Sequence, residues 1–309
     1  MKSATEKRRR LTPREIGKKM WDDRVGYLMA APYLILFIIF TVMPVLVSIF
    51  FSFTNFNMLE PPTWVGVENY ITLFFKDSIF LIAVRNTLIL AAITGPVGYL
   101  MCFFFAWCIN EFKPGLRAFI TLCFYAPSIS GNVYLIWTLM FSNDSAGLIN
   151  AWLLKLGVIS KAIQFTKDAK YMMPLAIAVI LWTSLGTSFL AFIAGFQGVD
   201  RTYYEAAAVD GIHNRWQELW FVTLPLMKNM LMFSAVMSIT GAFNVGDVIT
   251  ALFGFPSQGY ALHTIMHHLA DYGGQRFEMG YASAIATILF IVMIACNKLI
   301  QKMLAKVGN

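Results

Sequence analysis

Asp247 stands out among the residues that could do chemistry, because it lies inside a long apolar run, residues 226–253. An ionisable side chain in such a run is costly and by default marks a functional site. The other polar or aromatic candidates within apolar runs are Asn244, Trp182, Ser130 and Asn132. Together they could bind a hydroxyl-rich ligand through hydrogen bonds and ring stacking. Plain helix packing explains each of them as well, so both interpretations stay open.

Three histidines follow closely, at His263, His267 and His268. His263 and His267 have the i, i+4 spacing that places two ligands on one face of a helix. No Glu or Cys nearby completes a ligand set. We therefore expect no metal site here, and instead a polar helix that faces water or a partner protein.

Motifs for catalysis are missing from the sequence. It contains no G-x-x-x-x-G-K-[ST] phosphate loop and no G-x-S-x-G nucleophile elbow. The chain is therefore expected to be no enzyme and to bind no cofactor of its own. Any energy for its work must come from a partner.

A polar island, residues 202–225, separates two apolar runs. Thr202 and Glu205 have capping-box spacing, which predicts a short helix capped by Thr202. Three alanines, Ala206, Ala207 and Ala208, favour that helix and have little volume, so it can approach another protein closely.

The island continues with a corner and a second helix. Gly211 suits the left-handed turn that ends a helix. Asn214 and Gln217 repeat the capping spacing and predict another short helix. Pro225 marks a kink or restart before the next apolar run.

Composition decides what positions these residues. Hydrophobic residues make up 58% of the 309 residues and charged residues 13%, against about 25% charged in soluble domains. This predicts an all-α integral membrane protein, and the length suits about six spans. The expected spans are 27–53, 85–109, 118–141, 172–196, 226–253 and 281–300. The cysteines all fall inside apolar runs and are read as small hydrophobes; they are Cys102, Cys108, Cys123 and Cys296.

Around the spans we expect a basic tail over residues 1–26, a loop over 54–84, a core over 85–303 and a short tail over 304–309. Six spans leave both ends on one side. Of the 24 Lys and Arg residues, 17 lie on the side of the two ends and the island, and 7 on the other. Since Lys and Arg gather in cytoplasmic loops, both termini and the island are expected to be cytoplasmic. The charge is concentrated at the N-terminus, so the excess of +7 does not indicate nucleic-acid binding.

The island resembles the EAA loop of permease subunits in binding-protein-dependent ATP-binding-cassette (ABC) importers. The residues that match this motif are Glu205, Ala206, Ala207, Gly211, Val222, Leu224 and Pro225. Ten residues separate Gly211 from Val222, one more than usual. One extra residue turns a helix by about 100°, so the two short helices change phase unless that residue lies in the corner at 212–214.

The resemblance extends over residues 27–302, to the sugar-type branch with maltose, lactose and glycerol-phosphate permeases. SFTNFN and WVGVENY are similar to that branch's first outer loop, and FNVGDVITAL to its fifth span. MGYASAIATILF looks like the start of its last span. Asp200 stands where the family usually has a proline, and an Asp can cap a helix there. LFGFPSQG departs from the usual Thr-Gly-Gly-Pro.

This resemblance implies a fold and partners. The fold would be the type I ABC importer (MetI-like) permease with six transmembrane helices, as a multi-pass protein of the cell membrane in contact with lipid. The partners would be a second permease subunit, an extracytoplasmic substrate-binding protein and two ATPase subunits that bind ATP and Mg. The cargo would be a sugar, moved by alternating access. The residues that the resemblance assigns to ATPase coupling are Glu205, Ala206, Ala207, Asp210, Gly211 and Pro225.

Two rival functions stay open. A glycerol-phosphate or polyol permease is the nearer one, although phosphate would favour cations inside a span and none is evident. An ion-coupled secondary transporter is the other. Such proteins usually show internal repeats, and residues 27–160 and 161–309 show no resemblance to each other.

Overall fold

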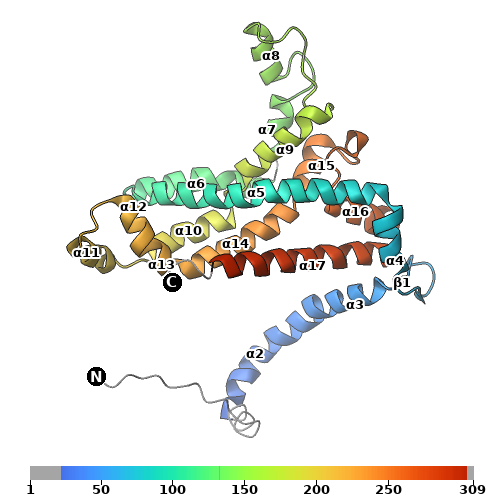
Figure 1. The fold of residues 1–309 in the computed structure, drawn as a ribbon, viewed down its shortest axis with the longest axis horizontal. Helices are drawn as coiled ribbons and strands as arrows, with labels where there is room; N and C mark the ends of the chain where they lie inside the picture. Colours follow the sequence, from blue (N-terminus) through green and yellow to red (C-terminus); the bar gives the residue numbers. More distant parts are fainter. Residues whose placement is uncertain (1–21, 132, 305–309) are drawn as a thin grey trace.

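The computed structural model describes residues 22–131 and 133–304, and these are mostly helical. Long helices lie alongside one another in a bundle (Figure 1). Among the described residues the strands are a single antiparallel pair, β1 (Thr54–Asn55) and β2 (Thr63–Trp64), with Thr54 opposite Trp64. Most of the two expected tails, and the candidate Asn132, lie outside the described residues.

The helices follow the chain in the order used below. The α-helices are α2 (Arg24–Phe37), α3 (Met43–Phe51), α4 (Glu68–Ile71), α5 (Ser78–Asn110), α6 (Pro114–Ile129), α7 (Val133–Met140), α8 (Leu148–Lys155), α9 (Ala169–Thr183), α10 (Thr187–Gln197), α11 (Arg201–Val209), α12 (Arg215–Glu218), α13 (Leu224–Leu226), α14 (Lys228–Phe243), α15 (Gly246–Phe253), α16 (Ile265–Ala270) and α17 (Met279–Leu304). π-Helical turns cover Ile38–Val42, Thr72–Lys76, Leu219–Thr223 and Asp271–Gln275, and a 3-10 turn covers Gln258–Tyr260.

Five of the described helical units are long and apolar enough to cross a membrane: Arg24–Phe51, Ser78–Asn110, Ala169–Gln197, Lys228–Phe253 and Met279–Leu304. A sixth arises if the bent pair α6 and α7 forms one span. These two helices meet at 80°, within the range 118–141 that the sequence predicted as one span.

The second span begins earlier than the sequence predicted, at Ser78 instead of residue 85. The Asp77 side chain caps it, accepting a hydrogen bond from the Phe80 amide at 2.9 Å. The apolar stretch from Ile79 to Val84 then continues the helical turn without a break.

Helix α5 lies at the centre of the bundle, against α10 and α14. Small residues let these helices approach closely. A Cβ added to Gly98 would lie 3.2 Å from the Ser184 hydroxyl, and one added to Gly95 would lie 3.5 Å from Ala242. The helix runs on through Pro96. Gly95 and Gly98 therefore serve close contact between helices.

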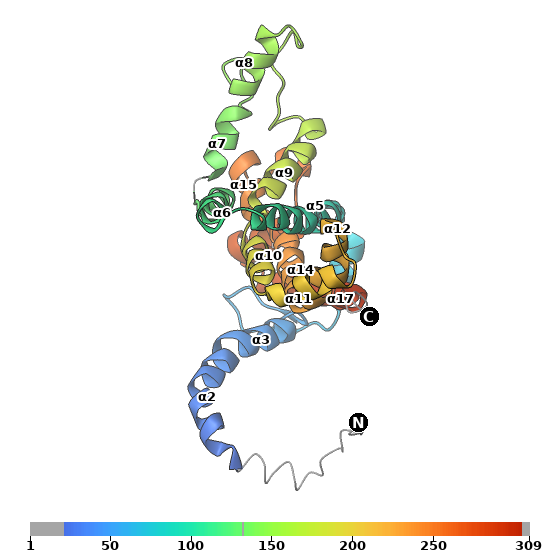
Figure 2. The same cartoon turned by 90° about the vertical axis from the view of Figure 1, so that its left-hand side faces the viewer.

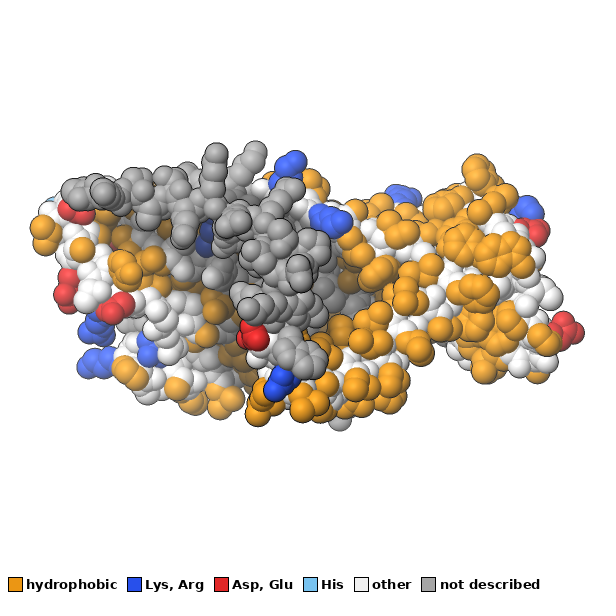
Figure 3. All heavy atoms as spheres, turned by 90° about the horizontal axis from the view of Figure 1, so that it is seen from below, with side chains coloured by type: hydrophobic (Ala, Val, Ile, Leu, Met, Phe, Trp, Pro, Cys, Tyr) orange, Lys and Arg blue, Asp and Glu red, His pale blue; other side chains and the backbone are white. Residues whose placement is uncertain are grey.

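The first span lies at the edge of the bundle, where α3 contacts α17. None of the residues of α2, the π turn after it, or α3 is buried. Figures 1 and 2 show this helix leaving the bundle on one side, while α7 and α8 extend on the other. Its end meets α17, where the Gly280 amide donates to the Phe56 carbonyl at 2.9 Å. Hydrophobic side chains form broad patches over the described part of the face in Figure 3.

The three histidines are buried, with His263, His267 and His268 exposed by 2%, 4% and 1%. The expectation of a polar helix that faces water or a partner is therefore wrong. Their ring nitrogens instead bond to groups within the chain, His268 to Asp77 and His267 to Thr264.

Candidate functional site

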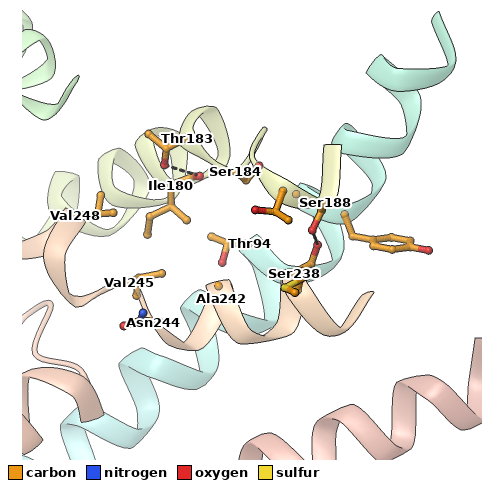
Figure 4. Close-up of a pocket in the computed structure, with 15 residues that line it drawn as sticks. Thr94, Ile180, Thr183, Ser184, Ser188, Ser238, Ala242, Asn244, Val245 and Val248 are labelled. Carbon is orange, nitrogen blue, oxygen red and sulfur yellow. Dashed lines mark hydrogen bonds between the residues drawn. The ribbon is translucent and has the colours of Figure 1, made fainter. Parts of the chain in front are cut away.

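A cavity of about 270 Å³ opens between α5, the α9–α10 pair and the α14–α15 pair (Figure 4). Hydroxyl and amide side chains make up much of its lining. They are Thr94, Tyr99, Thr183, Ser184, Thr187, Ser188, Ser238 and Asn244. Of the described residues that line the cavity, none carries a formal charge. Such a surface can hold a neutral, hydroxyl-rich molecule through many weak hydrogen bonds.

Two helix breaks create this polar lining inside apolar spans. The first separates α9 from α10, where Gly186 adopts an extended backbone at φ −108° and ψ −131°. Near it the Thr183 and Ser184 hydroxyls bond back to carbonyls of α9, at 3.1 and 2.7 Å. Interrupted helices satisfy their freed backbone groups in this way at membrane depth.

Serines join the broken helix to α14. The Ser188 hydroxyl donates to the Ser234 carbonyl at 3.2 Å, and the Ser234 hydroxyl donates to the Ser188 carbonyl at 3.3 Å. The Ser238 hydroxyl lies 3.2 Å from that of Ser188 (Figure 4). The wall of the cavity is therefore held by direct hydrogen bonds between two spans.

The second break lies at Asn244 and Val245, between α14 and α15. Asn244 lines the cavity. Asp247 is in the first turn of α15, where the helix N-terminus favours a negative charge. Asp247 is exposed and does not line the cavity.

The predicted pathway residues therefore do not come together. Of those that the structure describes, Asn244 alone lines the cavity. Trp182 packs edge-to-face on Trp137, with ring centroids 5.3 Å apart. Ser130 is exposed at the end of α6.

Sequence reasoning missed the hydroxyl groups that do line the cavity. A signal for them existed. The sequence T-S-L-G-T-S, residues 183–188, interrupts the fourth apolar run with four hydroxyls around a glycine.

Residues 202–225 form a second surface, at the end of the molecule that carries α11 and α12 (Figure 1). Asp200 caps α11, accepting from the Thr202 amide at 3.0 Å. The predicted cap at Thr202 is therefore wrong, and Thr202 lies within the first turn. Asp200 has the extended backbone that is usual for a residue just before a helix. This conformation lets its carboxylate accept a hydrogen bond from an amide of the first turn.

The corner and the second helix form as predicted. Gly211 has φ +90°, and the Ile212 amide donates back to the Ala207 carbonyl at 3.0 Å, which closes a Schellman turn. Asn214 caps α12 by accepting from the Trp216 amide at 3.0 Å.

Helix α12 continues into the π turn Leu219–Thr223 and then α13. A π turn closes a hydrogen bond over one residue more than an α turn, and here the Leu224 amide donates to the Leu219 carbonyl. This π turn lies in the same segment as the extra residue between Gly211 and Val222.

Polar contacts hold this surface to the bundle. The Tyr204 and Thr223 hydroxyls lie 2.9 Å apart. Arg215 pairs with Glu218 at 2.7 Å and with Glu111, just after α5, at 3.1 Å. The hydrogen bond to Glu218 raises the pKa of Arg215, so this link keeps its charge.

The outer side of α11 contacts no other described part of the chain closely. Ala207 is buried, but Glu205, Ala206 and Asp210 are exposed, and Val209 is 88% exposed. Trp216, Trp220 and Phe221 are exposed beside it. The surface thus combines carboxylates with apolar groups, a composition that suits a protein partner.

Comparison with known proteins gives consistent matches. The chain is 32% identical over 280 residues to a probable ABC transporter permease protein, YesP, of Bacillus subtilis, covering 88% of this chain and 87% of that protein. It is 29% identical to the lactose transport system permease protein LacF of Rhizobium radiobacter, over 75% and 76% of the two chains. It is 28% identical to the arabinooligosaccharides transport system permease protein AraP of Bacillus subtilis, over 90% and 87%.

Among solved structures, the fold matches a chain of a bacterial ABC transporter involved in import of the acidic polysaccharide alginate. The TM-score is 0.76 at 24% identity, over 95% of this chain and 99% of that chain. A second match, with a TM-score of 0.75 and 23% identity over 94% and 98% of the chains, is an alginate transporter in complex with an alginate pentasaccharide-bound periplasmic protein. No family model matches the chain.

Proposed function

The chain belongs to the permease subunits of sugar ABC transporters, and from this premise we propose that its hydroxyl-lined cavity is part of the passage for a neutral oligosaccharide. The chain is a multi-pass protein of the cell membrane. Its spans would open the cavity to each side in turn, driven by ATPase subunits.

The observation that carries this proposal is the uncharged lining of the cavity. Sugars offer hydroxyl groups, and serine, threonine and asparagine side chains can both donate to them and accept from them. A phosphate would instead be met by Lys or Arg, and neither is among the described lining residues. The lining therefore favours a neutral sugar over glycerol-phosphate or an acidic saccharide. A polyol is the nearest rival.

The exposed side of α11 supports a second part of the proposal, the docking of an ATPase. Glu205 and Ala206, with Asp210 and Gly211, would enter a groove on that partner. Ala207 is buried on the inner side of α11, so it would hold the helix to this chain and not touch the ATPase, and Pro225 would pass the motion to α14. The π turn at Leu219–Thr223 would take up the extra residue of this loop. ATP and Mg would be bound by the partner.

The proposed assembly has a second permease subunit, two ATPase subunits and an extracytoplasmic substrate-binding protein. Its two permease chains would surround the passage, with both termini of this chain in the cytoplasm. The cavity described here would form one side of the passage.

A pull-down of the tagged full chain from its native membrane, followed by mass spectrometry, tests the assembly. We expect an ATPase, a second permease and a sugar-binding protein. The purified assembly is then offered neutral oligosaccharides, uronic-acid oligosaccharides and glycerol-phosphate, and ATPase stimulation is measured. Stimulation by neutral oligosaccharides alone supports the cargo. A chain that purifies by itself and drives uptake with an ion gradient would show a secondary transporter.

A further inference from the structure

A chain of buried polar side chains joins the segment between α15 and α17 to the start of α5. Asp77, at the start of α5, has its Oδ2 atom 2.9 Å from His268 Nε2 and 2.9 Å from the Tyr281 hydroxyl. His268 Nδ1 in turn lies 3.2 Å from His263 Nε2. The chain of contacts therefore runs from a carboxylate through two imidazole rings.

The chemistry of these groups fixes the direction of each hydrogen bond. Asp77 accepts as a carboxylate, so His268 carries its hydrogen on Nε2 and keeps a lone pair on Nδ1. His263 must then donate from its own Nε2. Its Nδ1 is left as a lone pair, which is buried without a hydrogen-bond partner. The row of hydrogen bonds from Asp77 therefore ends at Nδ1 of His263.

His267 makes a separate link. The Thr264 amide donates to its Nδ1 at 3.3 Å, which leaves the hydrogen on Nε2. That nitrogen lies 3.0 Å from the hydroxyl of Thr250, on α15. The histidines thus tie residues 254–278 to α5, α15 and α17 at once.

Charged and titratable groups face the histidines from every side. They are Asp77 before α5, Asp247 on α15, Tyr260 beside His263, Asp271 and Tyr272 in the π turn, Arg276 just after it, Glu278 before α17 and Tyr281 in its first turn. Arg276 pairs with Asp271 at 2.7 Å and lies over the Tyr272 ring at 4.3 Å.

Burial sets the charge states. It lowers the pKa of His263 to about 4, and it lowers the pKa of His267 and of His268, the latter against the pull of Asp77. Burial raises the pKa of Asp77, but hydrogen bonds from Phe80 and Tyr281, with His268, outweigh it and the net pKa is lowered. Near pH 7 the carboxylate is therefore charged and the three rings are neutral.

A further proton cannot be added to this row of hydrogen bonds without leaving one donor unpaired. It can enter at Nδ1 of His263, and the Nε2 hydrogen of that ring can then pass to Nδ1 of His268, which leaves the charge beside Asp77. In either state a hydrogen sits on Nδ1 of His263, where no acceptor lies within reach. A buried donor without an acceptor is costly.

We propose that His263, His267 and His268 form an acid-sensitive latch, which holds residues 254–278 onto α5, α15 and α17 while the rings are neutral and releases them on proton uptake. Release takes protons from the solvent and needs no other reactant. The folded pKa values lie below the value near 6.5 of a free histidine. The stabilisation is therefore complete above that value and is lost as the pH falls towards 4. This proposal rests on the geometry of this chain and stands whatever the cavity carries.

Hydrogen–deuterium exchange of the full chain in lipid nanodiscs tests the latch, at about pH 7.5 and about pH 5, corrected for intrinsic exchange. One histidine whose pKa rises from about 4 to 6.5 on opening predicts that protection of residues 260–278 falls about thirtyfold. Protection of α10, which contains no histidine, is the internal reference. Unchanged protection of residues 260–278 in the unmodified chain would overturn the proposal before any variant is made.

The double variant His263→Gln with His268→Gln is the second arm. A glutamine amide can keep the donor near the Nε2 position but does not titrate in this range. We expect its loss of protection at the lower pH to be much smaller than in the unmodified chain, because His267 is then the one ring of the latch that still titrates. The exposed His213 provides the matched control, and His213→Gln should respond as the unmodified chain does. An equal loss of protection in the double variant would show that other groups cause it.

Discussion

Gly280 sits where the first outer loop crosses the start of α17. A Cβ at this position would collide with the Thr54 carbonyl oxygen and lie 3.0 Å from the Phe56 amide, both backbone atoms. We expect Gly280→Ala to lower stability by about 1–3 kcal/mol through overpacking. Thermal unfolding of the purified chain measures this. Gly274→Ala is the control, since nothing lies within 4 Å of its added Cβ, and equal midpoints for the two variants would contradict the prediction.

Asn244 is the predicted pathway residue that does reach the cavity. Asn244→Leu keeps similar volume and removes the amide, so a sugar hydroxyl would lose its partner. We expect the sugar concentration for half-maximal ATPase stimulation to rise about tenfold, the effect of one lost hydrogen bond of about 1.5 kcal/mol. Thr240→Val, one turn earlier on α14, is the control, because Thr240 bonds back to Val236 and does not line the cavity. Equal effects of the two variants would exclude a direct role for Asn244.

Single residues were predictable where the cause is local. Gly211 ends α11 and Asn214 caps α12, both through contacts with residues nearby in the sequence, and both roles were predicted. His268 was not predictable in the same way, because its partner Asp77 lies 191 residues away. The sequence shows that these rings are polar, but it does not show that the Asp77 carboxylate lies beside His268 in the folded chain. The residue that caps α11, Asp200, lies two residues before Thr202, the predicted cap.

At the scale of elements, hydropathy locates the spans but not their interruptions. The runs expected at 172–196 and 226–253 match helical units in the structure, yet each unit is two helices with a break between them. The mean hydropathy of some twenty residues stays high even when three or four of them are polar. The cavity lies at these breaks, so the sequence predicted the walls of the site better than its lining.

The proposed contact between α11 and an ATPase can be tested at one exposed residue of this helix. Val209→Glu places a charge on its outer face, where a groove on the ATPase would have to desolvate it. We expect the chain to remain in the membrane while ATPase stimulation falls at least about tenfold. The same change at Val158, which is 68% exposed near α8, is the matched control. Full stimulation with Val209→Glu would rule out this face as the ATPase contact.

At the scale of the whole molecule, the resemblance to sugar ABC permeases is confirmed by the relatives, and the type I permease fold by the match to the alginate importer. Composition and the number of apolar runs already led to a membrane protein with about six spans. The placement of α3 against α17, with α2 leading away from the bundle, could not be predicted, because a hydropathy profile does not say what an apolar helix packs against.

The orientation of the chain is a prediction at this scale. The uneven distribution of Lys and Arg places both ends and residues 202–225 in the cytoplasm. A green fluorescent protein fused after residue 309 should therefore fluoresce, and alkaline phosphatase fused at residue 160 should be active. The reversed pattern of the two reporters would invert the orientation and remove α11 from contact with ATP-driven partners.

The position of the first span also bears on biogenesis. No residue of α2 or α3 is buried, and α3 contacts α17, the last helix, so the span stays in lipid or against another subunit until α17 is made. It can leave the translocon while the ribosome is still making α5. The bundle can then fold as its members emerge, and Gly280 joins the two parts only when α17, the last helix, is complete.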